Sequence, residues 1–221
     1  MAKYLVNDSS LTAVADAIRT KGGTSEALSF PDGFVSAVEG IQAGGGGDDL
    51  LLMRISDTLT NVDIDMQGLT LLERAFNSCS KLETVKLSNV AINDYGSRYA
   101  FLGCSSLKKA EISFVGGSSL PSFTFQDCSQ LKEVILECTH LDGSSMFKAS
   151  ALNILVLKAN RVVTIGNINA FNSTPFASGG TGGTVYVPSA LIEQYQQATN
   201  WSTLYAAGTC NFVAIEGSEY E

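Results

Sequence analysis

Phenylalanine recurs through the middle of this chain about every 24 residues, at Phe76, Phe101, Phe125, Phe147 and Phe171. In the first three copies a leucine follows six residues later, at Leu82, Leu107 and Leu131, and in the fourth copy Leu152 comes one residue sooner. A short apolar segment follows each leucine, as in Val85–Leu87 and Val134–Leu136. A fixed period of this length indicates stacked repeats, each of which packs on its neighbours.

The period and its L-x-x-L-x-L character predict a leucine-rich repeat solenoid of the α/β type, with one short strand in each repeat. Parallel strands stack about 4.8 Å apart, and alternate side chains point to opposite faces. Val85 and Leu87 are therefore expected to point inward. Their register predicts one outward column, which comprises Asp63, Lys86, Glu111, Ile135 and Val156.

Residues 1–43 differ from the repeats and predict a small hairpin of two amphipathic helices. The apolar positions that share helical faces are Leu11, Val14, Ile18, Phe34, Val38 and Ile41. A unit of this size is too small to be stable alone. We therefore expect it to serve oligomerisation or anchoring, and we expect the glycine-rich residues 44–49 to form a flexible linker.

The predicted solenoid covers residues 50–187, and residues 188–221 break the period. In this last segment Ser189 is expected to cap a helix from about residue 190 to 198. Phe212 to Ile215 is expected to be a closing strand. The end of a solenoid exposes its core, so an atypical capping unit is required there.

The charge balance argues against two classes of partner. The chain has 14 basic and 22 acidic residues and a net charge of −8. Nucleic-acid phosphates and anionic membrane surfaces both favour basic proteins. The sequence has no apolar run near 20 residues and no visible signal peptide. We therefore expect neither a nucleic-acid partner nor a membrane span.

The chain carries no convincing catalytic or metal-binding motif. Cys79, Cys104 and Cys128 occupy equivalent repeat positions and are expected to be reduced, buried wedges rather than zinc ligands. His140 lies two residues from Cys138 but has no third group to orient it. The acidic pairs Asp63/Asp65 and Glu133/Glu137 are read as parts of a solvated face rather than as glycosidase or calcium sites. We expect no enzyme activity, no metal and no cofactor.

The segment from Ala75 to Leu82, A-F-N-S-C-S-K-L, and its later copies resemble BspA-like leucine-rich repeats. The resemblance covers roughly residues 55–175. It implies a solenoid used in adhesion and surface recognition.

The two ends resemble tail proteins of phages and prophages of Gram-positive bacteria. The residues that carry this likeness are 11–22 with Phe30, Pro31 and Phe34, and Tyr186 to Pro188 with Tyr195 and residues 198–202. The likeness implies a virion tail protein, made in the bacterial cytoplasm, that recognises a host cell-surface glycan or protein. It also implies contact with other tail proteins and a homo-oligomer, for which a trimer is expected. A structural tail or baseplate subunit and a bacterial adhesin remain as alternatives.

Two candidate recognition surfaces stand out. The first is the loop from Asn93 to Tyr99, whose Tyr95, Arg98 and Tyr99 are expected to emerge beside Phe114. Tyr and Arg are frequent in binding hot spots. The alternative, left open here, is that Tyr95 and Tyr99 fold back over the solenoid and Phe114 is core. The second surface is the apolar part of the strand face, at Ile135, Ile154 and Val156.

Overall fold

The structure is a computed structural model of the chain, and it describes residues 59–92, 97–117, 119–141 and 143–221. Residues Thr60–Glu221 form one compact unit. The expected hairpin of residues 1–43 and the linker of residues 44–49 lie outside the described residues, as do residues 50–58 and Tyr95.

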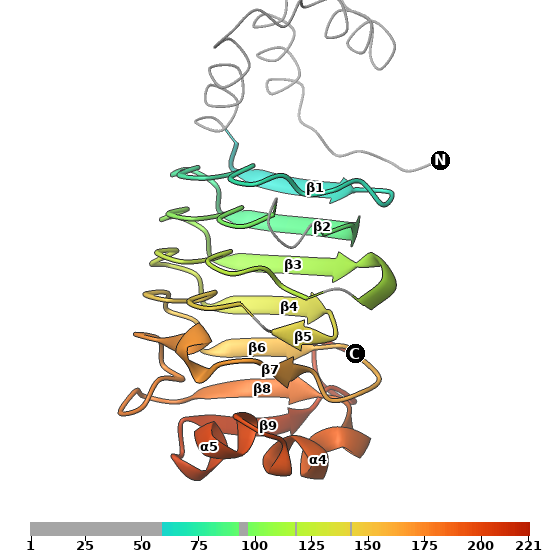
Figure 1. The fold of residues 1–221 in the computed structure, drawn as a ribbon, viewed down its shortest axis with the longest axis vertical. Coiled ribbons are helices and arrows are strands. Elements are labelled where there is room, and N and C mark those ends of the chain that lie inside the picture. The colour runs from blue at the N-terminus through green and yellow to red at the C-terminus, as the bar shows by residue number, and fades with distance from the viewer. Residues whose placement is uncertain (1–58, 93–96, 118, 142) are drawn as a thin grey trace, which may run out of the picture. The chain divides into compact units, whose positions relative to one another are not determined.

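A parallel sheet of seven strands runs along the described unit, with the strand order β1-β2-β3-β4-β6-β8-β9 (Figure 1). A smaller sheet pairs β5 with β7. The few helices are short, so the structure is the repeat solenoid that the period predicts. The strands are β1 (Asn61–Asp65), β2 (Thr84–Val90), β3 (Lys109–Phe114), β4 (Glu133–Glu137), β5 (His140–Leu141), β6 (Ile154–Leu157), β7 (Thr164–Ile165), β8 (Gly183–Val187) and β9 (Cys210–Ala214). The helical segments are η1 (Val115–Gly117), η2 (Ile168–Phe171), η3 (Ser189–Leu191), α4 (Ile192–Gln197) and α5 (Trp201–Ala206).

The strand register confirms the expected alternation of inward and outward side chains. Val85 pairs with Ala110, and that position continues along the sheet to Val134, Leu155, Val185 and Phe212. All of these side chains are buried. The next position along each strand forms the outward column that runs from Asp63 through Lys86 and Glu111 to Ile135 and Val156.

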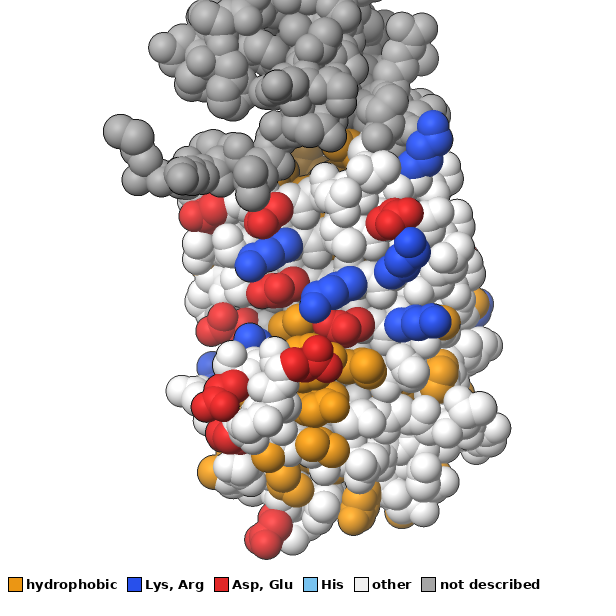
Figure 2. Space-filling model, turned by 180° about the vertical axis from the view of Figure 1, so that it is seen from behind, with side chains coloured by type: hydrophobic (Ala, Val, Ile, Leu, Met, Phe, Trp, Pro, Cys, Tyr) orange, Lys and Arg blue, Asp and Glu red, His pale blue; other side chains and the backbone are white. Residues whose placement is uncertain are grey.

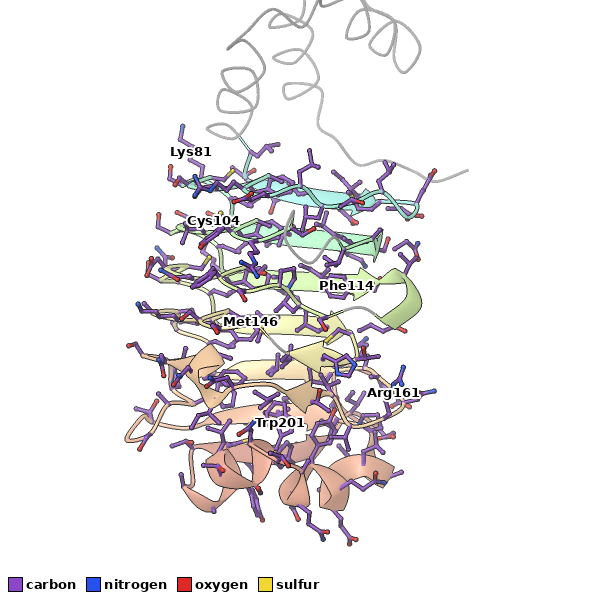
Figure 3. The ribbon with its side chains drawn as sticks, in the orientation of Figure 1. Lys81, Cys104, Phe114, Met146, Arg161 and Trp201 are labelled. Atoms are coloured by element: carbon purple, nitrogen blue, oxygen red, sulfur yellow. The ribbon has the colours of Figure 1, made fainter. Side chains whose placement is uncertain are left out.

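The repeat phenylalanines form a single internal column. Phe76, Phe101, Phe125, Phe147 and Phe171 stack in sequence, with neighbouring ring centroids 5.0, 5.3, 5.9 and 5.4 Å apart. The indole of Trp201 closes this column, with its centroid 6.1 Å from that of Phe171 (Figure 3). Stacked aromatic rings add to the free energy gained by burial. The column thus links each repeat to the next through the core.

The turns that carry these phenylalanines also form a backbone ladder. The N–H of Phe76 donates to the carbonyl of Ala100, and the N–H of Phe101 donates to that of Thr124. Residues two before and two after each of the first four phenylalanines have positive φ angles, from Arg74 (59°) and Ser78 (59°) to Ser145 (53°) and Ala149 (60°). Only one of these positions is glycine, Gly103. The sequence did not reveal this pattern, because most of its members are ordinary residues.

The cysteine column is confirmed. All five cysteines are free and buried. The thiol of Cys104 donates to the carbonyl of Phe76 at 2.9 Å, and the thiol of Cys128 donates to that of Phe101 at 3.0 Å. Hydrogen bonding to Cys128, with burial, raises the pKa of Cys104 to about 12. These thiols are therefore buried wedges of the core, and two of them donate hydrogen bonds to backbone carbonyls.

The C-terminal unit closes the core while continuing the same sheet. Helix α4 follows η3 as expected, but the side chain of Ser189 does not cap it. Instead the backbone N–H of Ser189 donates to the Glu216 carboxylate at 2.9 Å. The indole of Trp201 donates to the carbonyl of Val163, and the phenol of Tyr195 accepts from the N–H of that residue. No helix within the described part of the chain is long and apolar enough to cross a membrane.

Candidate functional site

The outward face of strands β1 to β4 is covered by charged side chains of both signs (Figure 2). Ion pairs join neighbouring repeats: Lys86 to Glu111 at 3.7 Å, Lys108 to Glu83 at 2.9 Å and Lys109 to Glu133 at 2.6 Å. The first two pairs are largely exposed, and exposed pairs stabilise a protein by only about 0–1 kcal/mol each. Their charged groups can therefore exchange partners with a ligand at little cost.

A shallow hollow lies on this face, across strands β2, β3, β4 and the residue that follows β6. Ser88 and Ser113 are the small residues of its lining, and charged side chains surround them. The space within it is about 290 Å³, open solvent included. Its lining comprises Lys86, Leu87, Ser88, Glu111, Ile112, Ser113, Ile135, Glu137 and Lys158.

The hollow coincides with an irregularity in β2. The register between β2 and β3 shifts between Leu87 and Val90, and Asn89 has a φ of 54°. The N–H of Asn89 donates to the hydroxyl of Ser113 at 3.3 Å, and its side-chain amide donates to Asp65 at 2.9 Å. Bulges of this kind occur often beside functional sites, where they redirect side chains. This one brings the end of β2 onto the hydroxyl of Ser113.

Two charged residues of the hollow, on neighbouring repeats, form no ion pair with each other. Glu137 is the last residue of β4, and Lys158 follows β6 directly, with its N–H bonded to the carbonyl of Leu136. Both side chains are exposed. Within the described residues, no ion pair of 4.0 Å or less joins them. A carboxylate and an ammonium group are thus available to a ligand at this end of the hollow.

The apolar part of the strand face is covered, so the expectation of an exposed patch there is wrong. Residues Ile215–Glu221, which we call the C-terminal strap, turn back across it. Tyr220 packs with the buried side chains of Ile135 and Val156, which are 6% and 0% exposed. Ile154 is half-buried beside them. The sequence placed these residues in the correct column but could not show that a distant segment covers it.

The expected recognition loop is only partly described, and its described members do not form a free aromatic surface. The ring of Tyr99 stacks on that of Phe123, with centroids 4.8 Å apart, and the guanidinium of Arg74 lies 5.4 Å from its centre. Both faces of the Tyr99 ring are therefore occupied, which prevents it from stacking on a sugar. Arg98 is half-buried. Phe114 is 8% exposed and belongs to the core, so its assignment to the recognition surface is wrong.

Two other groups considered in the sequence, His140 and Asp65, each have a local hydrogen-bond partner. His140 lies in β5, and its Nδ1 is 2.7 Å from the hydroxyl of Thr164. The pKa of Asp65 is lowered by hydrogen bonds from the Asn89 side chain and the Gln67 backbone. Among the residues that the structure describes, no cluster of three or more His, Cys, Asp or Glu side chains could hold a metal ion.

The hollow is the feature that sequence reasoning missed. Its signals were present, because the small Ser88 and Ser113 follow the charged Lys86 and Glu111 at the same offset. The bulge at Asn89 was not visible, since it depends on how two strands pair.

A stack of parallel strands with an outward polar face and a capped end is the architecture of a leucine-rich repeat solenoid. The model of the BspA type leucine rich repeat region matches residues 54–176 in six copies, and the chain belongs to this family. Comparison with curated proteins and with solved structures gives no match.

Proposed function

We propose that this protein is a recognition protein of a phage or prophage tail, and that the charged strand face binds a molecule on the host cell surface. The observation that carries this proposal is the polar hollow at the β2 bulge, on an otherwise regular sheet. The family match supports a surface or adhesin-like role. The tail context rests on the resemblance of the two ends of the sequence.

The strand face suits binding better than catalysis. Its side chains are held by a ladder of parallel strands, so their positions vary little when a ligand binds. Its charges lie in exposed pairs, and they provide specificity and a fast encounter more than strong affinity. Repetition of the hollow's chemistry over several copies of the protein would raise the overall affinity through multivalency.

In this proposal residues 1–43 anchor the protein and join its copies, through Leu11, Val14, Ile18, Phe34, Val38 and Ile41. Other tail proteins and further copies of this chain are the proposed partners of that segment, with a trimer as the proposed state. The strand face binds the host molecule, which is a cell-wall glycan or a surface protein.

The test is the binding of labelled full-length protein to intact Gram-positive cells, compared with a variant in which the hollow is filled. Ser88→Trp places a large ring in the hollow, and within the described residues the Ser88 hydroxyl makes no hydrogen bond that the change would remove. Ser178→Trp is the matched control, because Ser178 is exposed outside the hollow. We expect Ser88→Trp to lose cell binding and Ser178→Trp to retain it. Equal binding by both variants would exclude the hollow as the recognition site.

The family match favours a second candidate, a bacterial surface adhesin. The two candidates differ in where the protein is found. Gold-labelled antibodies against this chain should decorate the tails of virions released from the bacterium if the first is correct. Label on the bacterial surface and none on virions would support the adhesin. Label on tails, with no cell binding by the purified protein, would support a structural tail or baseplate subunit.

A further inference from the structure

We infer that the hollow binds a group that carries an ammonium and a carboxylate together, such as a short free peptide or an amino acid joined to a polymer through its side chain. This inference rests on the proposed recognition function. Its first support is the balance of charge in the lining, which contains Lys86, Lys158, Glu111 and Glu137. A ligand of one sign would meet as much repulsion as attraction there. A ligand with both signs can place each charge beside its opposite.

The two halves of the hollow differ in whether their charged side chains form an ion pair with each other. Lys86 and Glu111 already face each other at 3.7 Å. Glu137 ends β4 and Lys158 directly follows the neighbouring strand β6. Within the described residues, no ion pair joins them. The ligand ammonium is therefore assigned to Glu137 and the ligand carboxylate to Lys158. Both are charge-assisted contacts, which are stronger than contacts between neutral groups.

The lining also argues against a neutral sugar as the main ligand. None of the residues that line the hollow is aromatic, so no ring is available for a sugar face to stack on. The hydroxyls of Ser88 and Ser113 can each donate and accept hydrogen bonds. Those hydroxyls suit an amide or hydroxyl group that lies between the two charged ends of a ligand.

The experiment is an NMR titration of the full-length protein with three forms of one dipeptide. Unprotected alanyl-alanine has both charges, N-acetyl-alanyl-alanine lacks the ammonium, and alanyl-alanine amide lacks the carboxylate. We expect the unprotected form to shift the amide signals of Ser88, Ser113, Glu137 and Lys158, and each blocked form to bind at least ~2-fold more weakly. Equal binding by the three forms, or shifts confined to other parts of the molecule, would overturn the inference.

Variants of the protein give the reciprocal measurement. Glu137→Gln should weaken the unprotected dipeptide by ~2- to 5-fold and leave the affinity of the N-acetyl form unchanged, because that form has no ammonium for Glu137 to hold. Lys158→Gln should do the same for the unprotected dipeptide and leave the amide form unchanged. Glu193→Gln and Lys148→Gln are the matched controls, since both side chains are exposed outside the hollow. Losses of equal size in the controls would contradict the assignment.

A competition experiment identifies the source of the ligand. The combined results then test the ligand class and the proposed recognition function separately. Isolated cell walls and their soluble digest, used as competitors of the dipeptide, show whether the group is attached to a polymer or free. If cells bind through the hollow but the three dipeptide forms bind alike, the ligand class is wrong and the recognition function stands. If the dipeptide binds as expected but cells do not, the recognition function is wrong and the site stands.

Discussion

The ring of Tyr220 lies nearly edge-on to the ring of Tyr186, with centroids 4.7 Å apart and planes at 61°. This contact holds the C-terminal strap on the strand face, where Tyr220 also covers Ile135 and Val156. The strap has its own hydrogen bonds, including one from the hydroxyl of Ser218 to the carbonyl of Ile215 at 2.6 Å. As a result, apolar residues that point outward from the sheet become part of the interior.

The strap should be required for stability, and Tyr220→Ala tests this. Burying a side chain of this size stabilises a protein by about 1.5–3 kcal/mol, so we expect a loss of that order in the free energy of unfolding. The variant should also bind a dye that reports exposed apolar surface. Urea denaturation and dye fluorescence are the measurements. Tyr205→Ala is the control, because Tyr205 is 41% exposed. An unchanged midpoint and no added fluorescence would show that the strap does not cover the face in solution.

Alkaline pH should loosen the strap. Burial raises the pKa of the Tyr220 phenol, and the negative charge of Glu133 adds to this effect. The unfolded chain has a tyrosine pKa of about 10. Since the folded value is higher, this contribution to stability is complete below pH ~10 and is lost as the pH rises toward the folded value.

Tyr220→Phe isolates that contribution, because phenylalanine has no proton to lose. We expect its free energy of unfolding to fall less steeply above pH ~10 than that of the wild type, in urea titrations at several pH values. Burial also raises the pKa values of Tyr195 and Cys210, but these groups are present in both proteins and cancel in the comparison. Identical slopes would contradict the burial of the phenol.

The phenylalanine column should behave as one buried unit. Phe101 stacks between two neighbouring rings and is 0% exposed. Phe101→Ala is expected to cost about 3–5 kcal/mol, as buried aromatic residues do in general. Phe76→Ala should cost less, because Phe76 is half-buried. Thermal and urea unfolding measure both, and a loss at Phe101 no larger than that at Phe76 would count against the column.

The positive φ angles in the turns predict opposite effects for two exchanges between glycine and alanine. Gly103 and Ala149 occupy equivalent positions, with φ angles of 71° and 60°. A Cβ atom at Gly103 would have its nearest neighbour 3.6 Å away, so the effect of adding one comes from the backbone alone. Gly103→Ala should destabilise by about 0.5–1 kcal/mol, and Ala149→Gly should stabilise by a similar amount. Changes of the same sign in urea denaturation would show that the turns relax.

Much of the fold could be predicted from the sequence because the repeats are nearly equivalent. The offset between each phenylalanine and its strand is almost constant, so it determined the strand register, the phenylalanine column and the cysteine column. The alternation of side chains along a strand then determined that Val85 points inward and Lys86 outward. These relationships are local within a repeat, and stacking transmits them from one repeat to the next.

Other features depend on contacts between segments that are not equivalent positions of the repeat. Only the tertiary structure shows these contacts. Ile135 and Val156 occupy an outward column yet are buried, because the strap returns to them from the far end of the chain. Tyr99 lies in a promising loop, yet Phe123 and Arg74 occupy its two faces. The hollow lies beside the bulge of β2 at Asn89, and it brings Glu137 and Lys158 into one lining because β4 and β6 are neighbours in the sheet. Burial and site geometry result from contacts between distant residues, and a repeat pattern read along the chain contains no information about which distant segment covers which face.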